Sequence, residues 1–179
     1  MGRGRTTTGM VISTLVYFVR HQGFISSPEA VPEESGGSLE DFPEASSISS
    51  EQERELYLAG NYRLINQLLP ALEYGKRAKR LVDKAVDHCD HVQNLRRAIY
   101  DYKVADGGDR GLNYLLRYFF LIVFAEYLIE MVSESVDAMQ SEEDEVAIPK
   151  APVVTFSSWL QERREITNMI ARRELLDFS

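Results

Sequence analysis

The stretch from residue 112 to residue 135 constrains the fold more than any other part of this 179-residue sequence. A helix drawn through it is apolar around most of its circumference, and the stretch holds no glycine or proline. Such a helix is buried, so we expect it to be the central core element. Its most apolar run, residues 118–125, lies between Arg117 and Glu126. Because a membrane span needs ~20 apolar residues, we expect no membrane span.

Apolar residues recur at helical spacing along most of the remaining sequence, with no internal repeat. The spacing predicts further helices over residues 6–20, 51–59, 61–73, 76–88 and 92–104, and a last one that includes Trp159, Ile166, Met169 and Ile170. The only extended piece that we expect lies near residues 153–155. The sequence therefore predicts a mainly α protein.

Several residues predict where these helices begin and end. Threonines 6–8 can cap the first helix, and Ser50 with Glu53 resembles the start of the second. Ser157 or Ser158 is expected to cap the last helix. Pro70 should kink or end the helix over residues 61–73. The glycines at 107 and 108 predict a break.

Two acidic segments divide the chain. Residues 21–53 hold no lysine or arginine, and three of the six prolines lie at 28, 32 and 43. Such a composition cannot bury enough apolar surface to offset its ordering entropy, so we expect a disordered linker. The predicted organisation is a loop end and helix (1–20), an acidic linker (21–50), a helical part (51–135), a second acidic linker (136–155) and a C-terminal helical segment (156–179).

Composition narrows the classes of function. A net charge of -8 argues against general nucleic-acid binding. The single cysteine excludes an intramolecular disulfide and fits a reducing compartment. The N-terminus lacks the cleavage site of a signal peptide, so we expect a cytoplasmic protein.

The first eight residues, Met-Gly-Arg-Gly-Arg-Thr-Thr-Thr, have the chemistry of an anion site. Glycines let backbone N–H groups converge, a helix N-terminus adds positive potential, and arginine binds two phosphate oxygens at once. Three interpretations compete. A nucleotide-binding loop would need a lysine before Thr6 and another glycine spacing. The others are a terminal tail without function and the end of the phosphatase signature Cys-x5-Arg-Ser/Thr, with Arg5 as its arginine.

Motifs along the chain favour the phosphatase interpretation. Residues 2–12 (GRGRTTTGMVI), 74–76 (YGK), 92–96 (VQNLR), 98–103 (AIYDYK) and 159–160 (WL) occur in the order typical of one family. In these motifs the chain resembles the paladin family, which is related to phytase-like and protein-tyrosine-phosphatase-type cysteine-dependent phosphatases. The resemblance implies the helical C-terminal part of an α/β fold whose sheet-forming region is largely missing.

The resemblance also implies a mechanism and its residues. A thiolate attacks phosphorus, loop amides and an arginine stabilise the equatorial oxygens, and an upstream aspartate protonates the leaving oxygen. Arg5 is then the bidentate phosphate ligand and Thr6 the hydroxyl that stabilises the thiolate. The loop amides come from Gly2, Arg3 and Gly4. No metal or cofactor is implied, and the substrate is a phosphorylated protein or an inositol phosphate.

The sequence departs from this pattern at its start. The nucleophilic cysteine is expected upstream of Met1, so we expect this chain to be inactive alone. The alternatives are a catalytically silent phosphate-binding module and a helical protein-interaction module. The apolar stripe from Val11 to Val19 is expected to have lost a sheet, and exposed apolar faces of that size favour self-association.

Structural roles are also considered for the other candidate residues, and they explain Cys89 and the histidines better than catalysis or metal binding. Cys89 follows His88, and a His-Cys pair also opens the phosphatase signature. Six residues rather than five, however, separate Cys89 from Arg96. We expect a half-buried helical cysteine. Residues 88–91 (His-Cys-Asp-His) lack a second cluster that would complete a zinc site. The basic residues within 76–84 form either a solvated face or a polyanion site. Gln93 and Asn94 either approach the phosphate site or start a helix.

Overall fold

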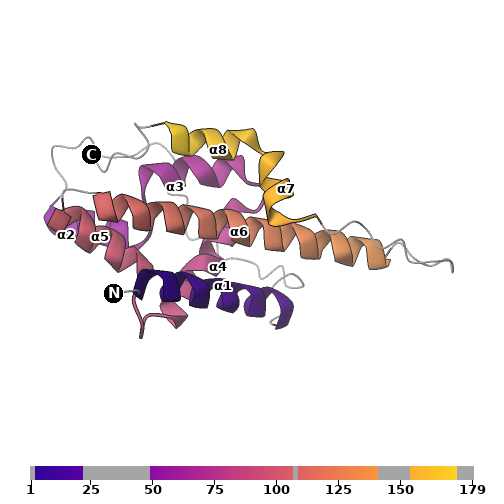
Figure 1. Cartoon of the computed structure of the whole chain (residues 1–179), viewed down its shortest axis with the longest axis horizontal. Coiled ribbons are helices and arrows are strands. Elements are labelled where there is room, and N and C mark those ends of the chain that lie inside the picture. The colour runs from indigo at the N-terminus through magenta and orange to yellow at the C-terminus, as the bar shows by residue number, and fades with distance from the viewer. Residues whose placement is uncertain (1–2, 22–48, 107–108, 141–153, 173–179) are drawn as a thin grey trace.

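The computed structural model describes residues 3–21, 49–106, 109–140 and 154–172. These residues form eight α-helices and one short 3-10 helix, and none of them lies in a strand. The expectation of a mainly α chain is confirmed (Figure 1). Val154 and Thr155, in the predicted extended piece, lie in no helix or strand, and Thr155 has extended backbone angles.

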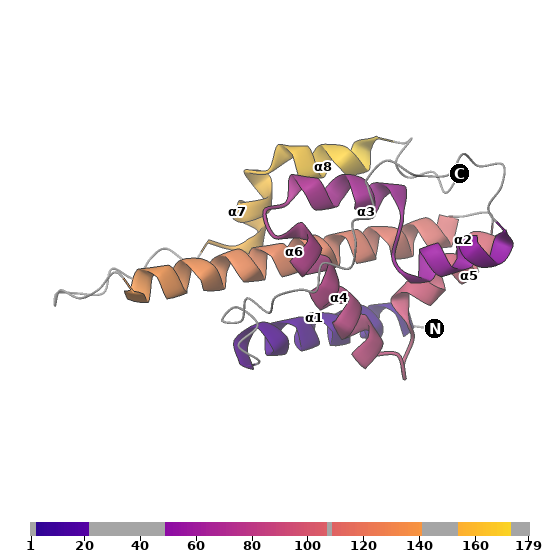
Figure 2. The ribbon, with the colours of Figure 1, turned by 180° about the vertical axis from the view of Figure 1, so that it is seen from behind.

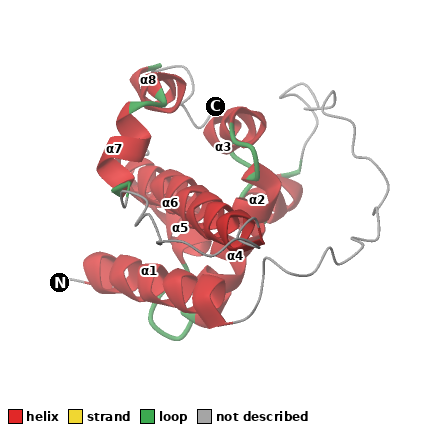
Figure 3. Ribbon diagram, turned by 90° about the vertical axis from the view of Figure 1, so that its right-hand side faces the viewer, coloured by secondary structure: helices red, strands yellow, loops and turns green. Residues whose placement is uncertain are grey.

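The longest helix, α6 (Asp109–Gln140), lies at the centre of the molecule, as its apolar sequence predicts. Tyr118, Phe119, Ile122 and Ile129 are at most 1% exposed. Figure 3 looks along this helix, with α1 on one side of it and α7 and α8 on the other. Among the described helices, none is long and apolar enough to cross a membrane.

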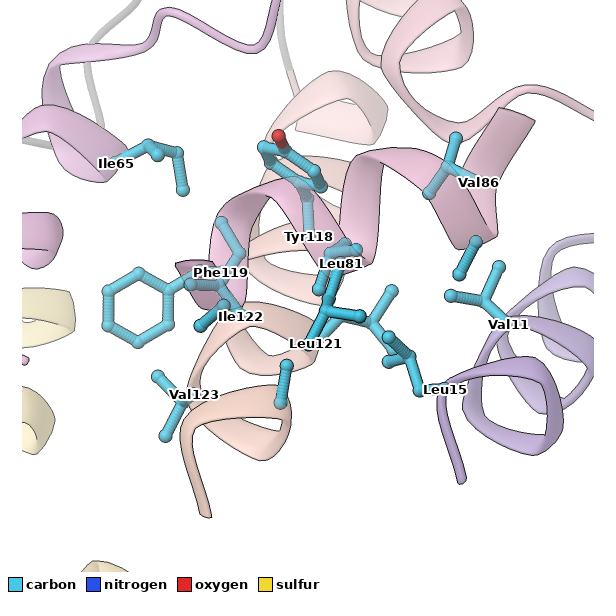
Figure 4. Packing of buried hydrophobic residues seen from close by; sticks show 14 of the residues in the cluster. Val11, Leu15, Ile65, Leu81, Val86, Tyr118, Phe119, Leu121, Ile122 and Val123 are labelled. Carbon is cyan, nitrogen blue, oxygen red and sulfur yellow. The ribbon is translucent and has the colours of Figure 1, made fainter. Parts of the chain in front are cut away.

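Helix α1 (Arg3–His21) packs against α4 (Gly75–His88) and α6. Its apolar stripe is buried, with Val11 and Leu15 completely inaccessible to solvent. Figure 4 shows Val11 and Leu15 facing Leu81 and Val86 of α4. The expectation that this stripe would be exposed is therefore wrong, because α4 and α6 cover the face that we expected a sheet to cover.

The start of α1 also differs from the prediction. The helix begins at Arg3, three residues before Thr6. Threonines 6–8 therefore lie inside it and do not occupy the capping position. Thr7 is 1% exposed and faces the core.

The chain from α2 to α5 follows the predicted order, with shifted boundaries. Helix α2 (Ser50–Leu58) is capped by Ser49, whose side chain forms a capping box with Gln52, one residue earlier than the predicted pair. Helix α3 (Arg63–Leu68) ends before Pro70, which lies in the 3-10 helix η1 (Leu69–Ala71). Helix α5 (Leu95–Asp106) packs along α6 and against α2.

Within the described residues 154–172, two helices rather than one follow α6. They are α7 (Phe156–Gln161) and α8 (Arg164–Ala171), and α8 lies beside α3 (Figure 2). Thr155 caps α7 by accepting a hydrogen bond from the Ser158 amide. The predicted caps, Ser157 and Ser158, lie inside α7, because the helix begins one residue before Ser157.

Candidate functional site

The sequence-predicted phosphate site lies at the start of α1. Arg3, Gly4 and Arg5 form its first turn, whose amide groups have no carbonyl partners within a helix. The side chains of Arg5 and Thr6 are exposed. Gly2 lies outside the described residues. This turn brings an arginine, a hydroxyl and the positive end of a 19-residue helix together at the surface.

A surface hollow of about 550 Å³ opens beside this turn. One wall is α1 and the other is the turn between α4 and α5, which is more than 70 residues away in sequence. It is lined by Thr6, Gly9, Met10, Ser13, Thr14, His88, Cys89 and His91. The hollow therefore joins Thr6, a predicted site residue, to the two histidines that sequence analysis had set aside.

Cys89 forms part of this wall but is not an accessible nucleophile. It is 1% exposed, so it is buried rather than half-buried as predicted. Its amide caps the end of α4 by donating to the carbonyls of Ala85 and Val86. Its Sγ lies 3.7 Å from the Thr14 hydroxyl. These contacts indicate a packing role at the seam of α1 and α4.

Arg96 is not directed at a phosphate. Its guanidinium contacts Asp83 at 3.1 Å and Asp87 at 2.5 Å, and only 14% of its side chain is exposed. Burial lowers the pKa of Arg96, but these two carboxylates outweigh burial and hold the pKa above its usual range. Arg96 is thus an internal ion-pair partner, and residues 89–96 do not form a second phosphate loop.

The basic helix has two kinds of lysine and arginine. Lys79 is turned inward and contacts the Asp83 carboxylate and the Ala59 carbonyl, each at 2.8 Å. Lys76, Arg80 and Lys84 are exposed, and Lys84 lies 5.4 Å from the Phe18 ring of α1. Most of this basic charge is therefore at the surface.

Gln93 and Asn94 occupy the turn before α5. The Asn94 side chain accepts from the amides of Arg96 and Arg97, which makes it the cap of α5. The interpretation of Asn94 as a helix start is confirmed. Gln93 accepts a 3.5 Å hydrogen bond from the Tyr114 hydroxyl, which ties the turn to α6.

Helix α6 holds a buried charge-bearing group that the sequence did not lead us to expect. Glu126, on α6, is fully buried, and its Oε1 accepts from the Tyr74 amide at 2.6 Å, immediately before α4. Its other oxygen is buried and has no hydrogen-bond partner. Burial raises the pKa of Glu126, and the nearby acids Glu130 and Glu73 raise it further. The available signal was an acidic residue that directly follows the most apolar run of the sequence, residues 118–125.

The first turn of α1 has the groups that the sequence predicts for an anion site, but no accessible thiol lies among the described residues. Arg5 and the first-turn amides of α1 can bind an oxyanion. No described group of three or more His, Cys, Asp or Glu side chains could hold a metal ion.

Comparison with known proteins links the chain to paladin. It is 28% identical to human paladin and 25% identical to zebrafish (Danio rerio) paladin, each over 177 residues and 89% of this chain. Chicken (Gallus gallus) paladin is 29% identical over 143 residues, or 71% of the chain. The resemblance seen in the motifs is thus confirmed as a distant similarity along most of the chain.

The chain spans about 16% of the length of the human and zebrafish relatives and corresponds to a short portion of a larger protein. No protein-family model matches the sequence, and no solved structure matches it.

Proposed function

We propose that this chain is the phosphate-binding, helical part of a cysteine-dependent phosphate-monoester hydrolase of the paladin type. In this proposal Arg5 binds the phosphoryl oxygens, and the amides of Gly2, Arg3 and Gly4 contribute further hydrogen bonds. The observation that carries the proposal is the distant similarity to three paladins, which extends over most of the chain.

The geometry of α1 supports the same role. The guanidinium group of an arginine and the N-terminus of a helix both stabilise a negative charge. They lower the activation barrier when they contact the oxygens on which charge develops during phosphoryl transfer. Thr6 follows Arg5 directly, where its hydroxyl can stabilise a thiolate. Thr6 is exposed at the start of α1, so a thiolate can approach this residue.

The nucleophile must come from outside these residues. Cysteinyl-phosphate chemistry needs an accessible thiolate, and the only cysteine, Cys89, is buried. We therefore expect no turnover by this chain alone. The substrate class remains phosphoproteins or inositol phosphates.

Hydrolysis of p-nitrophenyl phosphate tests the proposal. This chain is compared with one extended upstream to include the expected cysteine and sheet. Activity only in the extended chain, with roughly a 100-fold or larger loss in kcat for Arg5→Lys, supports the proposal. Lysine keeps the charge but loses the bidentate geometry. Activity of the short chain would contradict it.

A second candidate is a silent phosphate-binding module, which the buried packing of α1 favours. Because α4 and α6 already hold α1, its first turn is positioned without a sheet. Phosphate at about 100 times Kd should then raise the free energy of unfolding by about 2.7 kcal/mol. Loss of this effect in Arg5→Ala, with no activity in the extended chain, would favour this candidate over the hydrolase.

A further inference from the structure

We infer that the hollow between α1 and the α4–α5 turn binds the organic group of a phosphate monoester whose phosphate lies at Arg5. This inference rests on the proposed function, because it takes Arg5 as the phosphate ligand. The hollow is then the surface that recognises the organic group to which the phosphate is attached.

Arg5 lies close to the hollow along α1. Arg5 and Gly9 are four residues apart on α1, and both are exposed. Residues at this spacing are neighbours on one helix face, with Cβ atoms about 5–6 Å apart. Thr6 and Gly9 line the hollow and Arg5 does not, so a phosphate held by Arg5 would lie beside the hollow, within reach of an organic group that occupies it.

The space in front of Gly9 is open. A Cβ atom added to this glycine would have nothing within 4 Å, whereas one added at Gly60 or Gly75 would collide with its neighbours. The α1 wall of the hollow therefore has open space in front of residue 9, where a side chain could be added without a clash. The volume of about 550 Å³ lies within the range of roughly 300–1,000 Å³ for small-molecule sites.

The walls of the hollow combine apolar and polar side chains. On α1, Met10 offers apolar contact, while Thr6, Ser13 and Thr14 add hydroxyl groups. The Ser13 hydroxyl donates to the Gly9 carbonyl at 3.0 Å, so its lone pairs can accept from a ligand. A mixed surface of this kind suits an organic group with a few polar atoms better than a bare anion.

The opposite wall supplies imidazoles from the last residue of α4 and from the turn that follows it. His88 and His91 line the hollow from either side of Cys89, and both are exposed. Cys89 anchors the turn through backbone hydrogen bonds, and the Asn94 side chain accepts a hydrogen bond from the Arg96 amide. Side chains on such a supported turn keep their positions, which favours recognition. Each imidazole can donate or accept a hydrogen bond to a polar atom of the ligand.

Binding of phenyl phosphate and inorganic phosphate to this chain, measured by isothermal titration calorimetry at pH 7, tests the inference. Gly9→Leu adds a bulky side chain to the α1 wall of the hollow, and Gly9→Ala is the matched control that adds only a methyl group. Neither should harm the fold, since both residues form helices better than glycine. Thermal unfolding of both variants checks this point.

We expect phenyl phosphate to bind roughly tenfold more tightly than inorganic phosphate. Gly9→Leu should remove this advantage and leave inorganic phosphate unaffected. Equal binding of both ligands, unchanged in Gly9→Leu, would overturn only the inference about the hollow. A loss of both ligands in Gly9→Leu would place the phosphate in the hollow and also overturn it. Failure of wild-type protein to bind either ligand would overturn the phosphate site at Arg5 as well.

Discussion

The hydroxyl of Tyr118 donates a 2.5 Å hydrogen bond to Oδ1 of Asp83 and so joins the central helix α6 to α4. The same carboxylate contacts Lys79 at 2.8 Å and Arg96 at 3.1 Å. Burial raises the pKa of the Tyr118 phenol, and the charge on Asp83 raises it further. The phenol therefore stays protonated and remains a donor to a charged acceptor throughout the neutral range.

Removing this hydroxyl should weaken the joint between α4 and α6. We expect Tyr118→Phe to lower the free energy of unfolding by about 1.5–3 kcal/mol, the range for hydrogen bonds to charged groups. Urea unfolding at pH 7, followed by circular dichroism, measures the change. Tyr17→Phe is the control, because Tyr17 is 55% exposed, and it should cost almost nothing. Equal stability of the two variants would show that the bond contributes little.

Gly60 lies beside the same hydroxyl and should tolerate no side chain. Its φ is 75°, and an added Cβ would lie 2.4 Å from the Tyr118 oxygen. We expect Gly60→Ala to cost more than about 1–2 kcal/mol, the penalty for the left-handed conformation alone. Gly9→Ala, in open space within α1, should instead stabilise the protein by about 1 kcal/mol. The same unfolding experiment compares them, and a harmless Gly60→Ala would contradict the described turn.

The contrast between α6 and the helix caps shows what could be predicted from the sequence. Apolar residues on most sides of residues 112–135 identify a buried helix whatever surrounds it. The cap of α2 is less determined, because Ser49 with Gln52 and Ser50 with Glu53 both match the capping pattern. Only the backbone geometry at Ser49 decides between them.

Periodicity shows that a face is buried but not what covers it. The stripe that includes Val11 and Leu15 led us to expect a missing sheet, whereas α4 and α6 bury it. The hollow has the same origin. Its walls, at Gly9 and His91, are 82 positions apart in the numbering, so no local spacing could reveal it.

The pH dependence of stability should report on Glu126. Its pKa is raised in the folded protein, chiefly by burial, so the folded state binds a proton more tightly than the unfolded state. Stability should therefore fall as pH rises from the usual carboxyl value of 4.5 through the raised pKa, and recover on acidification.

Glu126→Gln removes this titration while keeping an oxygen that can accept from the Tyr74 amide. We expect its free energy of unfolding to vary less than that of the wild type between about pH 4.5 and pH 7. Urea midpoints across this range measure the difference. Glu162→Gln, which removes an exposed carboxylate, is the control and should keep the wild-type slope. Identical profiles for Glu126→Gln and the wild type would exclude Glu126 as the source.

Trp159, the only tryptophan in the sequence, reports on how α7 and α8 are held against α6. Its indole N–H donates to Glu130 at 2.6 Å, and the Arg163 guanidinium donates to the same carboxylate oxygen at 2.6 Å. Arg163 also lies 3.9 Å from the centre of the indole ring. One arginine thus stacks on the tryptophan and neutralises its acceptor, so these three groups should act as a unit.

We expect Arg163→Ala to lower the free energy of unfolding by about 1.5–3 kcal/mol, because Glu130 loses its cation and Trp159 its stacking partner. The emission of Trp159, which is 2% exposed, should shift to longer wavelength at urea concentrations below the main transition seen by circular dichroism. Arg164→Ala changes the neighbouring exposed arginine and should leave both signals unchanged. Coincident transitions in Arg163→Ala would show instead that α7 and α8 unfold together with the core, held by buried side chains such as Ile166 rather than by the arginine.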